Sequence, residues 1–178
     1  MIVFGRLLSA SALIVLTVAK VQAGDGPCVW YHLPKNITQR ALAAGFEGGP
    51  GALSASISPD QMLQAEKICG LTAKNAVPLR KAEAGYMLQV LSEQWLLENG
   101  RISTQQLSGA WITMEKKAKA RMERWAVTLN HDPEGYSDAY QSFVTALGNP
   151  AHLPSDSKPK VLTYLQGRAL REIYEPQF

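Results

Sequence analysis

The sequence predicts an all-α protein: an irregular bundle of five or six helices, built around a long antiparallel helical hairpin and carrying one disulfide. Hydrophobic residues recur at spacings of three and four through most of the chain, which is the period of an amphipathic helix. No run of β-branched residues alternates with the period of two that is typical of a strand. The ten prolines fall mostly in a few short stretches, so the segments between them are free to form helices.

The size and composition fit a single globular domain preceded by a targeting segment. The chain has 178 residues, of which 46% are hydrophobic and 19% are charged, and a chain of this length buries a substantial core. It has no collagen-like glycine repeat, no polar low-complexity tract and no dense cysteine framework. We therefore expect residues 24–178 to form one all-α domain.

Residues 1–23 have the layout of a secretory signal peptide that is cleaved. Arg6 gives a positive start, residues 7–19 are apolar, and Val21 and Ala23 place small residues at the −3 and −1 positions of a cleavage site. A helix over the apolar run would rise about 20 Å, which is too short for the roughly 30 Å hydrocarbon core of a bilayer. We expect a periplasmic or secreted protein with no transmembrane helix after cleavage.

The charge of the mature chain is close to neutral. Cleavage removes two bases, Arg6 and Lys20, and no acid, so the formal net charge falls from +3 to +1. A chain with so small a charge lacks the positive field that recruits nucleic acid. We therefore expect no nucleic-acid partner.

The only two cysteines, Cys28 and Cys69, lie in the mature chain. In an oxidising compartment such a pair is expected to form a disulfide. The alternatives are two free buried thiols or a bond to another chain. Closing a loop of about 40 residues removes unfolded-state entropy worth roughly 4 kcal/mol. A metal site is the weaker interpretation, because the cysteines are far apart in sequence and no histidine cluster accompanies them. We expect no metal and no cofactor.

The start of the mature chain is expected to be mostly irregular. Residues 24–36 lack a clear helical pattern, and a short helix is expected from Asn36, a suitable N-cap, to Ala44, with Gly45 ending it. Glycines and a proline concentrate in residues 45–57, which predicts a flexible loop.

Two Ser-x-x-Gln sequences mark the starts of later helices. Each matches a capping box, in which the serine caps the helix and the glutamine returns a hydrogen bond. Ser58, followed by Pro59, begins a helix that runs to Cys69. Ser103 precedes a long helix over residues 104–130, in which apolar residues repeat at spacings of three and four.

The central hairpin is predicted from this long helix and the helix before it. Residues 78–98 place hydrophobic side chains on one helical face, and an Asn-Gly pair follows them. The link to residues 104–130 is short, and short links join antiparallel neighbours. Two further helices are expected over residues 137–147 and 159–174, separated by a proline-containing loop.

Common catalytic motifs are absent from the sequence, which contains no Gly-x-x-x-x-Gly-Lys, His-Glu-x-x-His or Gly-x-Ser-x-Gly. The one candidate is Glu47. Its tripeptide, Phe46-Glu47-Gly48, resembles the setting of the catalytic glutamate in lysozyme-type muramidases, which follows an early helix. The resemblance implies a peptidoglycan or glycan hydrolase with Glu47 as the general acid. The alternative is an ordinary glutamate in a glycine-rich loop.

The long helix 104–130 carries a basic stretch that is a candidate interaction face. Its five bases are Lys116, Lys117, Lys119, Arg121 and Arg124. Such a stretch is either the solvated face of a helix or a contact for an acidic partner or lipid head groups.

Three functions from different classes remain open. The first is a protein-binding module, such as an inhibitor, an immunity-type protector or a subunit of an envelope complex. The absent catalytic motifs, the disulfide and the near-neutral charge favour it. The alternatives are a peptidoglycan hydrolase that uses Glu47, and a membrane-surface or lipid-binding protein that uses the basic face.

Overall fold

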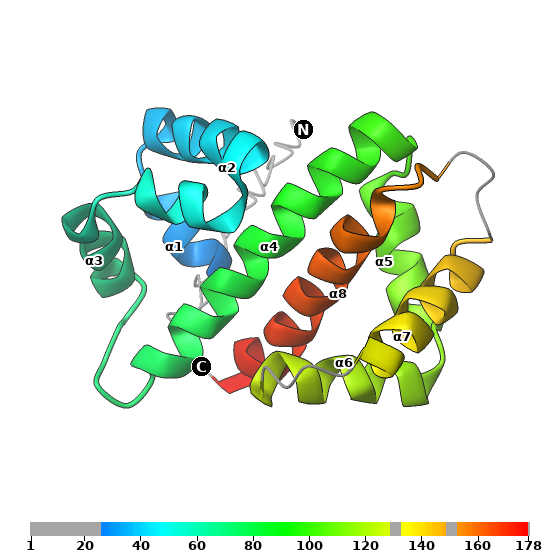
Figure 1. Ribbon diagram of the computed structural model, residues 1–178. Helices are drawn as coiled ribbons and strands as arrows, with labels where there is room; N and C mark the ends of the chain where they lie inside the picture. Colours follow the sequence, from blue (N-terminus) through cyan, green and yellow to red (C-terminus); the bar gives the residue numbers. More distant parts are fainter. Residues whose placement is uncertain (1–25, 129–132, 149–152, 178) are drawn as a thin grey trace, which may run out of the picture.

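The computed structural model describes residues 26–128, 133–148 and 153–177. The expected signal peptide, residues 1–23, lies outside them. Within these described residues the chain forms eight α-helices and no strand, so the prediction of an all-α fold is confirmed. The elements are α1 (Gly26–His32), α2 (Lys35–Ala55), α3 (Pro59–Ile68), α4 (Ala76–Gly100), α5 (Thr104–Thr113), α6 (Lys116–Thr128), α7 (Pro133–Ala146), α8 (Ser157–Tyr174) and the short 3₁₀ helix η1 (Glu175–Gln177) (Figure 1).

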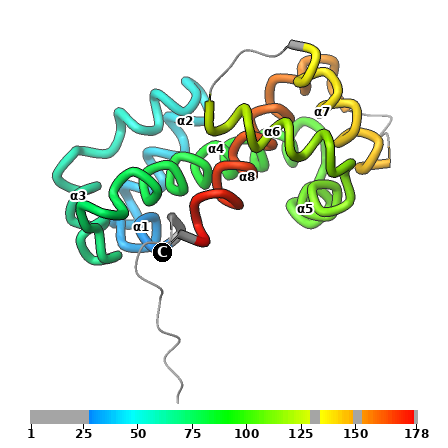
Figure 2. The backbone as a smooth tube through the Cα atoms, turned by 90° about the horizontal axis from the view of Figure 1, so that it is seen from below, coloured from blue at the N-terminus to red at the C-terminus, as the bar shows by residue number. Residues whose placement is uncertain are grey.

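Helices α4 and α8 form the centre of the molecule. They run antiparallel and side by side (Figure 1, Figure 2), and α8 corresponds to the predicted helix 159–174. A Cβ atom added to Gly167 would lie 2.6 Å from the carbonyl oxygen of Gly85 and 2.7 Å from the backbone nitrogen of Gln89. The two backbones therefore touch at this crossing, and only glycine leaves room for the contact.

The predicted hairpin between residues 78–98 and 104–130 is wrong. α4 packs mainly against α8, and the predicted long helix is broken into α5 and α6. The break lies at Met114, whose backbone is extended (φ −61°, ψ 158°). At the next residue, the backbone N–H of Glu115 donates to the Ser142 hydroxyl of α7 at 3.0 Å. Apolar residues on both sides of the break are buried in one cluster, so the periodicity of the sequence does not reveal it.

The N-terminal part is more helical than predicted, which raises the number of helices above the five or six expected. Residues 24–36, expected to be irregular, contain α1, and most of the loop expected over 45–57 belongs to α2. α2 is kinked at Gly49 (φ 79°, ψ −172°), and Pro50 starts its second part, where the N–H that proline lacks has no helical partner. Gly45 is buried inside α2 instead of ending a helix.

Several helix ends follow the signals in the sequence. Both capping boxes form: the Ser58 hydroxyl accepts the N–H of Gln61, and the Ser103 hydroxyl accepts the N–H of Gln106, each at 3.3 Å. Gly70 is left-handed (φ 82°) just after α3, as glycine commonly is beyond a helix end. These starts and stops are set within a few residues of sequence, which is why they are predictable.

Two hydrophobic clusters share α4. One gathers buried residues of α4 to α8 around Trp111 and Tyr164. The other lies among α1 to α4 and includes Leu53. The predicted disulfide between Cys28 and Cys69 is confirmed, and it joins α1 to the end of α3 within the second cluster.

Candidate functional site

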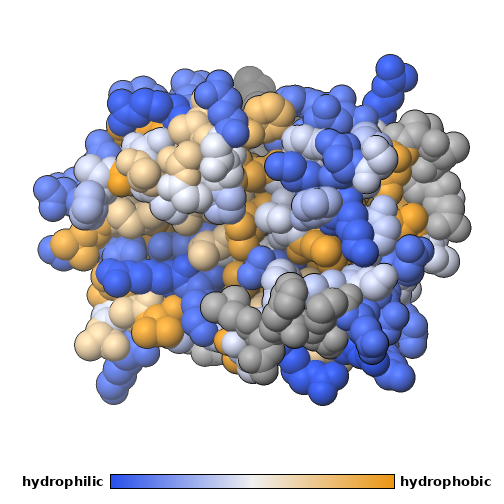
Figure 3. All heavy atoms as spheres, viewed as in Figure 1, coloured by the Kyte–Doolittle hydropathy of each residue, from blue (hydrophilic) through white to orange (hydrophobic). Residues whose placement is uncertain are grey.

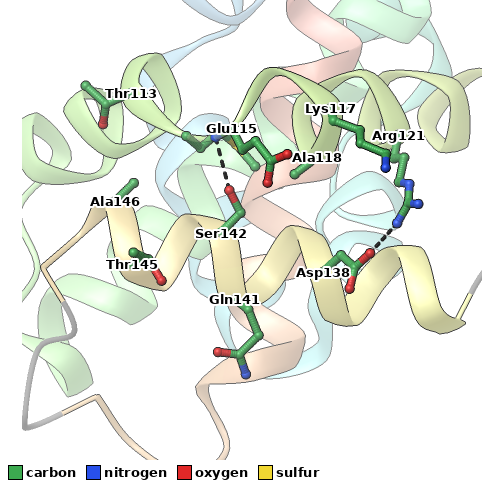
Figure 4. A pocket seen from close by; sticks show the side chains of 11 residues that line it. Thr113, Glu115, Lys117, Ala118, Arg121, Asp138, Gln141, Ser142, Thr145 and Ala146 are labelled. Atoms are coloured by element: carbon green, nitrogen blue, oxygen red, sulfur yellow. Dashed lines mark hydrogen bonds and ion pairs between the residues drawn. The ribbon is translucent and has the colours of Figure 1, made fainter.

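A groove of about 670 Å³ opens where α5, α6 and α7 meet. Glu115, Lys117 and Arg121 line one side of it, and Asp138 and Ser142 of α7 line the other (Figure 4). Arg121 forms an ion pair with Asp138, and the Ser142 hydroxyl accepts the backbone N–H of Glu115. The start of α6 and helix α7 are therefore joined by one ion pair and one hydrogen bond across the groove.

The groove offers polar contacts but no catalytic constellation. Its lining residues comprise two acids, two bases, and small polar and apolar side chains, with no histidine or cysteine among them. Nucleophilic catalysis needs a hydroxyl or thiol beside a base that takes its proton, and the Ser142 hydroxyl instead caps a backbone N–H. With its charges balanced, the groove suits a polar, uncharged contact better than an anion.

The five basic residues predicted as an interaction face point to different places. Lys119 pairs with an acidic side chain of α8, and Arg121 pairs with one of α7. Lys117 lines the groove with Arg121, whereas Arg124 lines a separate hollow beside the end of α8. Lys116 is exposed at the start of α6. Among the described residues, no helix combines the length and the hydrophobicity needed to cross a bilayer.

Glu47 is exposed on α2, just before the kink at Gly49. A small cavity beside the kink is lined by Phe46 and by residues of α4 and α8, but not by Glu47. A glycosidase needs two carboxyl groups that flank the bond to be broken. Glu47 lines none of the cavities described for this part of the chain, so its position gives the hydrolase hypothesis no support.

Two acidic side chains that the sequence did not indicate as candidates are buried on α3 and α4. Glu66 is 2% exposed, and its two carboxylate oxygens accept hydrogen bonds from the Arg80 guanidinium at 3.0 and 3.1 Å. Glu83 is 5% exposed, and its Oε1 has no hydrogen-bond partner within the described part of the chain. Burial, reinforced by the charge of Glu66 and opposed by that of Arg80, raises the pKa of Glu83 to about 8. At this pKa the Glu83 carboxyl is mostly protonated at neutral pH.

Glu83 adjoins a cavity that is too small for a substrate. The volume is about 10 Å³, roughly the space needed by a single water molecule. Its other lining residues are Val29, Trp30, Leu33, Met62, Tyr86 and Met87. These mostly apolar neighbours explain why the neutral form of the carboxyl is favoured. The sequence does carry a signal for this burial, since Glu83 is four residues after Leu79 and three before Tyr86, on the apolar face of α4.

The third unusual group surrounds the disulfide. The sulfurs of Cys28 and Cys69 and a ring nitrogen of His32 all lie within 4.8 Å of one another. The sequence did not indicate this group, because residues 24–36 were expected to be irregular; in a helix, Cys28 and His32 are one turn apart. While the two sulfurs are bonded to each other they are not thiolates, and thiolates are what bind metal.

Comparison with known proteins does not assign a family. No protein-family model matches the sequence, and no curated protein or solved structure shows significant similarity to it.

Proposed function

We propose that this is an exported helical protein that acts by binding another protein. The observation that carries the proposal is the set of exposed hydrophobic side chains on α1, α3 and the start of α4. They are Tyr31 (79% exposed), Leu63 (38%), Ile68 (62%) and Val77 (65%). Figure 3 shows hydrophobic side chains over α3 and near the start of α4. Hydrophobic side chains exposed in one region of a surface are typical of contact sites between proteins.

Helix α3 is suited to present such a contact, because it lies at the edge of the molecule (Figure 1) and is held in place by its links to α1 and α4. Among the helices it packs mainly against α1. The disulfide at Cys69 and the ion pair between Glu66 and Arg80 add two further links. Leu63 and Ile68 of this helix are both exposed. A surface that is already held in place loses less conformational freedom when it binds.

Two features support export. The disulfide is typical of proteins in oxidising compartments, and residues 1–23 have the layout of a signal peptide. An inhibitor, an immunity-type protector and an envelope-complex subunit all fit this description. The other two functions have less support, since Glu47 lies outside the described cavities and two of the five bases are paired.

The binding test uses the oxidised protein as bait in envelope and secreted fractions of its source organism, with chemical cross-linking. A captured protein is then purified and titrated against the bait. We expect Ile68→Glu to weaken binding by at least about tenfold, equivalent to roughly 1.4 kcal/mol. Ile112→Glu is the matched control, because Ile112 is 74% exposed on α5, away from this surface. The proposal is wrong if no protein is enriched over a mock bait, or if both variants bind alike.

Export is tested separately by mass spectrometry of the protein from its source. We expect a chain that begins at Gly24 in the periplasmic or secreted fraction. A chain that retains Met1 in the cytosol, with both cysteines open to alkylation, would contradict export.

A further inference from the structure

The disulfide region holds three potential metal ligands in one place. α1 places Cys28 and His32 four residues apart, so their side chains project from the same face of the helix. Cys69 follows the last residue of α3, and the packing of α3 on α1 brings its sulfur to the same point. The three ligand atoms lie within 4.8 Å of one another.

Once the bond between the two sulfurs is broken and they move apart, the three ligand atoms can take the spacing of a zinc site. With Zn–S bonds of about 2.3 Å and Zn–N bonds of about 2.0 Å, tetrahedral ligand atoms lie roughly 3.5 to 3.8 Å apart. Two thiolates and one imidazole form a donor set that suits a borderline-soft ion such as Zn²⁺. We propose that the reduced protein binds one Zn²⁺ through Cys28, His32 and Cys69, and that formation of the disulfide closes this site.

The burial of the three residues defines how an ion reaches the site. Cys28 and Cys69 are 3% and 0% exposed, whereas His32 is exposed. Zinc therefore enters from the side of His32. Three protein ligands leave the fourth position of a tetrahedral ion to water or to a ligand from a partner.

The redox step needs a two-electron reductant, which in the cell is a dithiol. The reductant transfers two electrons and two protons to the disulfide, giving two thiols, and is itself oxidised to a disulfide. Zn²⁺ then displaces the two thiol protons into solvent and binds the two thiolates and the neutral imidazole. This inference does not depend on the proposed protein-binding function.

The test titrates the protein with Co²⁺, a coloured substitute for Zn²⁺, after reduction with a phosphine that leaves no competing thiol. We expect one Co²⁺ per chain, a charge-transfer absorption from thiolate to metal, and displacement by Zn²⁺. The oxidised protein shows no such band. His32→Gln lowers the affinity at least about tenfold, whereas the exposed control Lys35→Gln leaves it unchanged.

Circular dichroism follows the helical fold through the titration. A reduced, folded protein that binds no Co²⁺, or a His32→Gln variant that binds as tightly as the wild type, overturns the proposal. If reduction alone unfolds the chain, Zn²⁺ must restore the helical signal, because binding to a site made by the fold stabilises the fold. Failure to restore that signal overturns the proposal as well.

Discussion

Replacing Gly167 with alanine tests the close crossing of α4 and α8. The added Cβ would lie 2.6 Å from the carbonyl oxygen of Gly85 and 2.7 Å from the nitrogen of Gln89, and neither backbone atom can rotate away. An ordinary contact begins near 3.4 Å, so the helices must separate by most of an ångström. This separation strains the hydrogen bond from Arg171 of α8 to the Gln89 side chain of α4, which measures 2.9 Å.

The size of the effect follows from two opposing terms. Overpacking costs about 1–3 kcal/mol, and the upper part of this range applies because the obstacle is backbone. Because alanine has a better helix propensity than glycine, the same substitution also stabilises the folded state by up to about 1 kcal/mol. We expect a net loss of about 2 kcal/mol in the free energy of unfolding, which lowers the Tm of a chain of this size by roughly 4–8 °C.

Thermal and urea unfolding, followed by circular dichroism, measure this loss. The control is Gly109→Ala on α5, where an added Cβ would meet nothing within 4 Å. Helix propensity alone predicts that this control is unchanged or is stabilised by up to about 1 kcal/mol. If Gly167→Ala is as stable as Gly109→Ala, the two backbones do not touch and the reasoning is refuted.

Three further predictions concern the buried acid, the disulfide and the break between α5 and α6. The pKa of Glu83 rises from 4.5 to about 8 on folding. The free energy of unfolding of the wild type therefore decreases as the pH rises from about 5 to about 8, by up to roughly 1.4 kcal/mol per pH unit. Urea unfolding across this range should show that Glu83→Gln removes the decrease. Replacing Cys28 and Cys69 with serine opens a loop of 41 residues and lowers the free energy of unfolding by about 4 kcal/mol; a loss below about 1 kcal/mol in urea unfolding would contradict this. Ser142→Ala removes the acceptor for Glu115 and costs about 0.5–1 kcal/mol in the same assay, whereas no change would show that the hydrogen bond does not stabilise the break.

How far the sequence predicts the fold depends on how local each signal is. The capping boxes at Ser58 and Ser103 form as expected, because each joins residues three apart in the chain. The break at Met114 is not predictable in this way. The N–H of Glu115 finds its acceptor on Ser142, which belongs to a different helix. The apolar period runs through the break because both parts bury their side chains in the same cluster.

The unusual side chains escape prediction for a related reason. Glu83 falls on an apolar helical face, but its raised pKa arises from neighbours on other helices and from the charge of Glu66. The spacing of Cys28 and His32 suggests shared ligands only once α1 is known to be a helix. Glu47, by contrast, is a candidate only through its short sequence context, and that context says nothing about burial.

The disulfide lies in the smaller of the two hydrophobic clusters. The cluster of α4 to α8 buries large side chains such as Trp111, Phe143 and Tyr164 completely. The cluster of α1 to α4 is smaller, and α1 and α3 are short helices, so hydrophobic burial does less to hold them. A covalent link between them restricts the unfolded states of this weaker part. The same bond links α1 to the end of α3, two of the elements that carry the proposed contact surface, and lies beside His32. Reduction therefore acts first on α1 and α3, which couples the proposed metal site to the proposed binding surface through one bond.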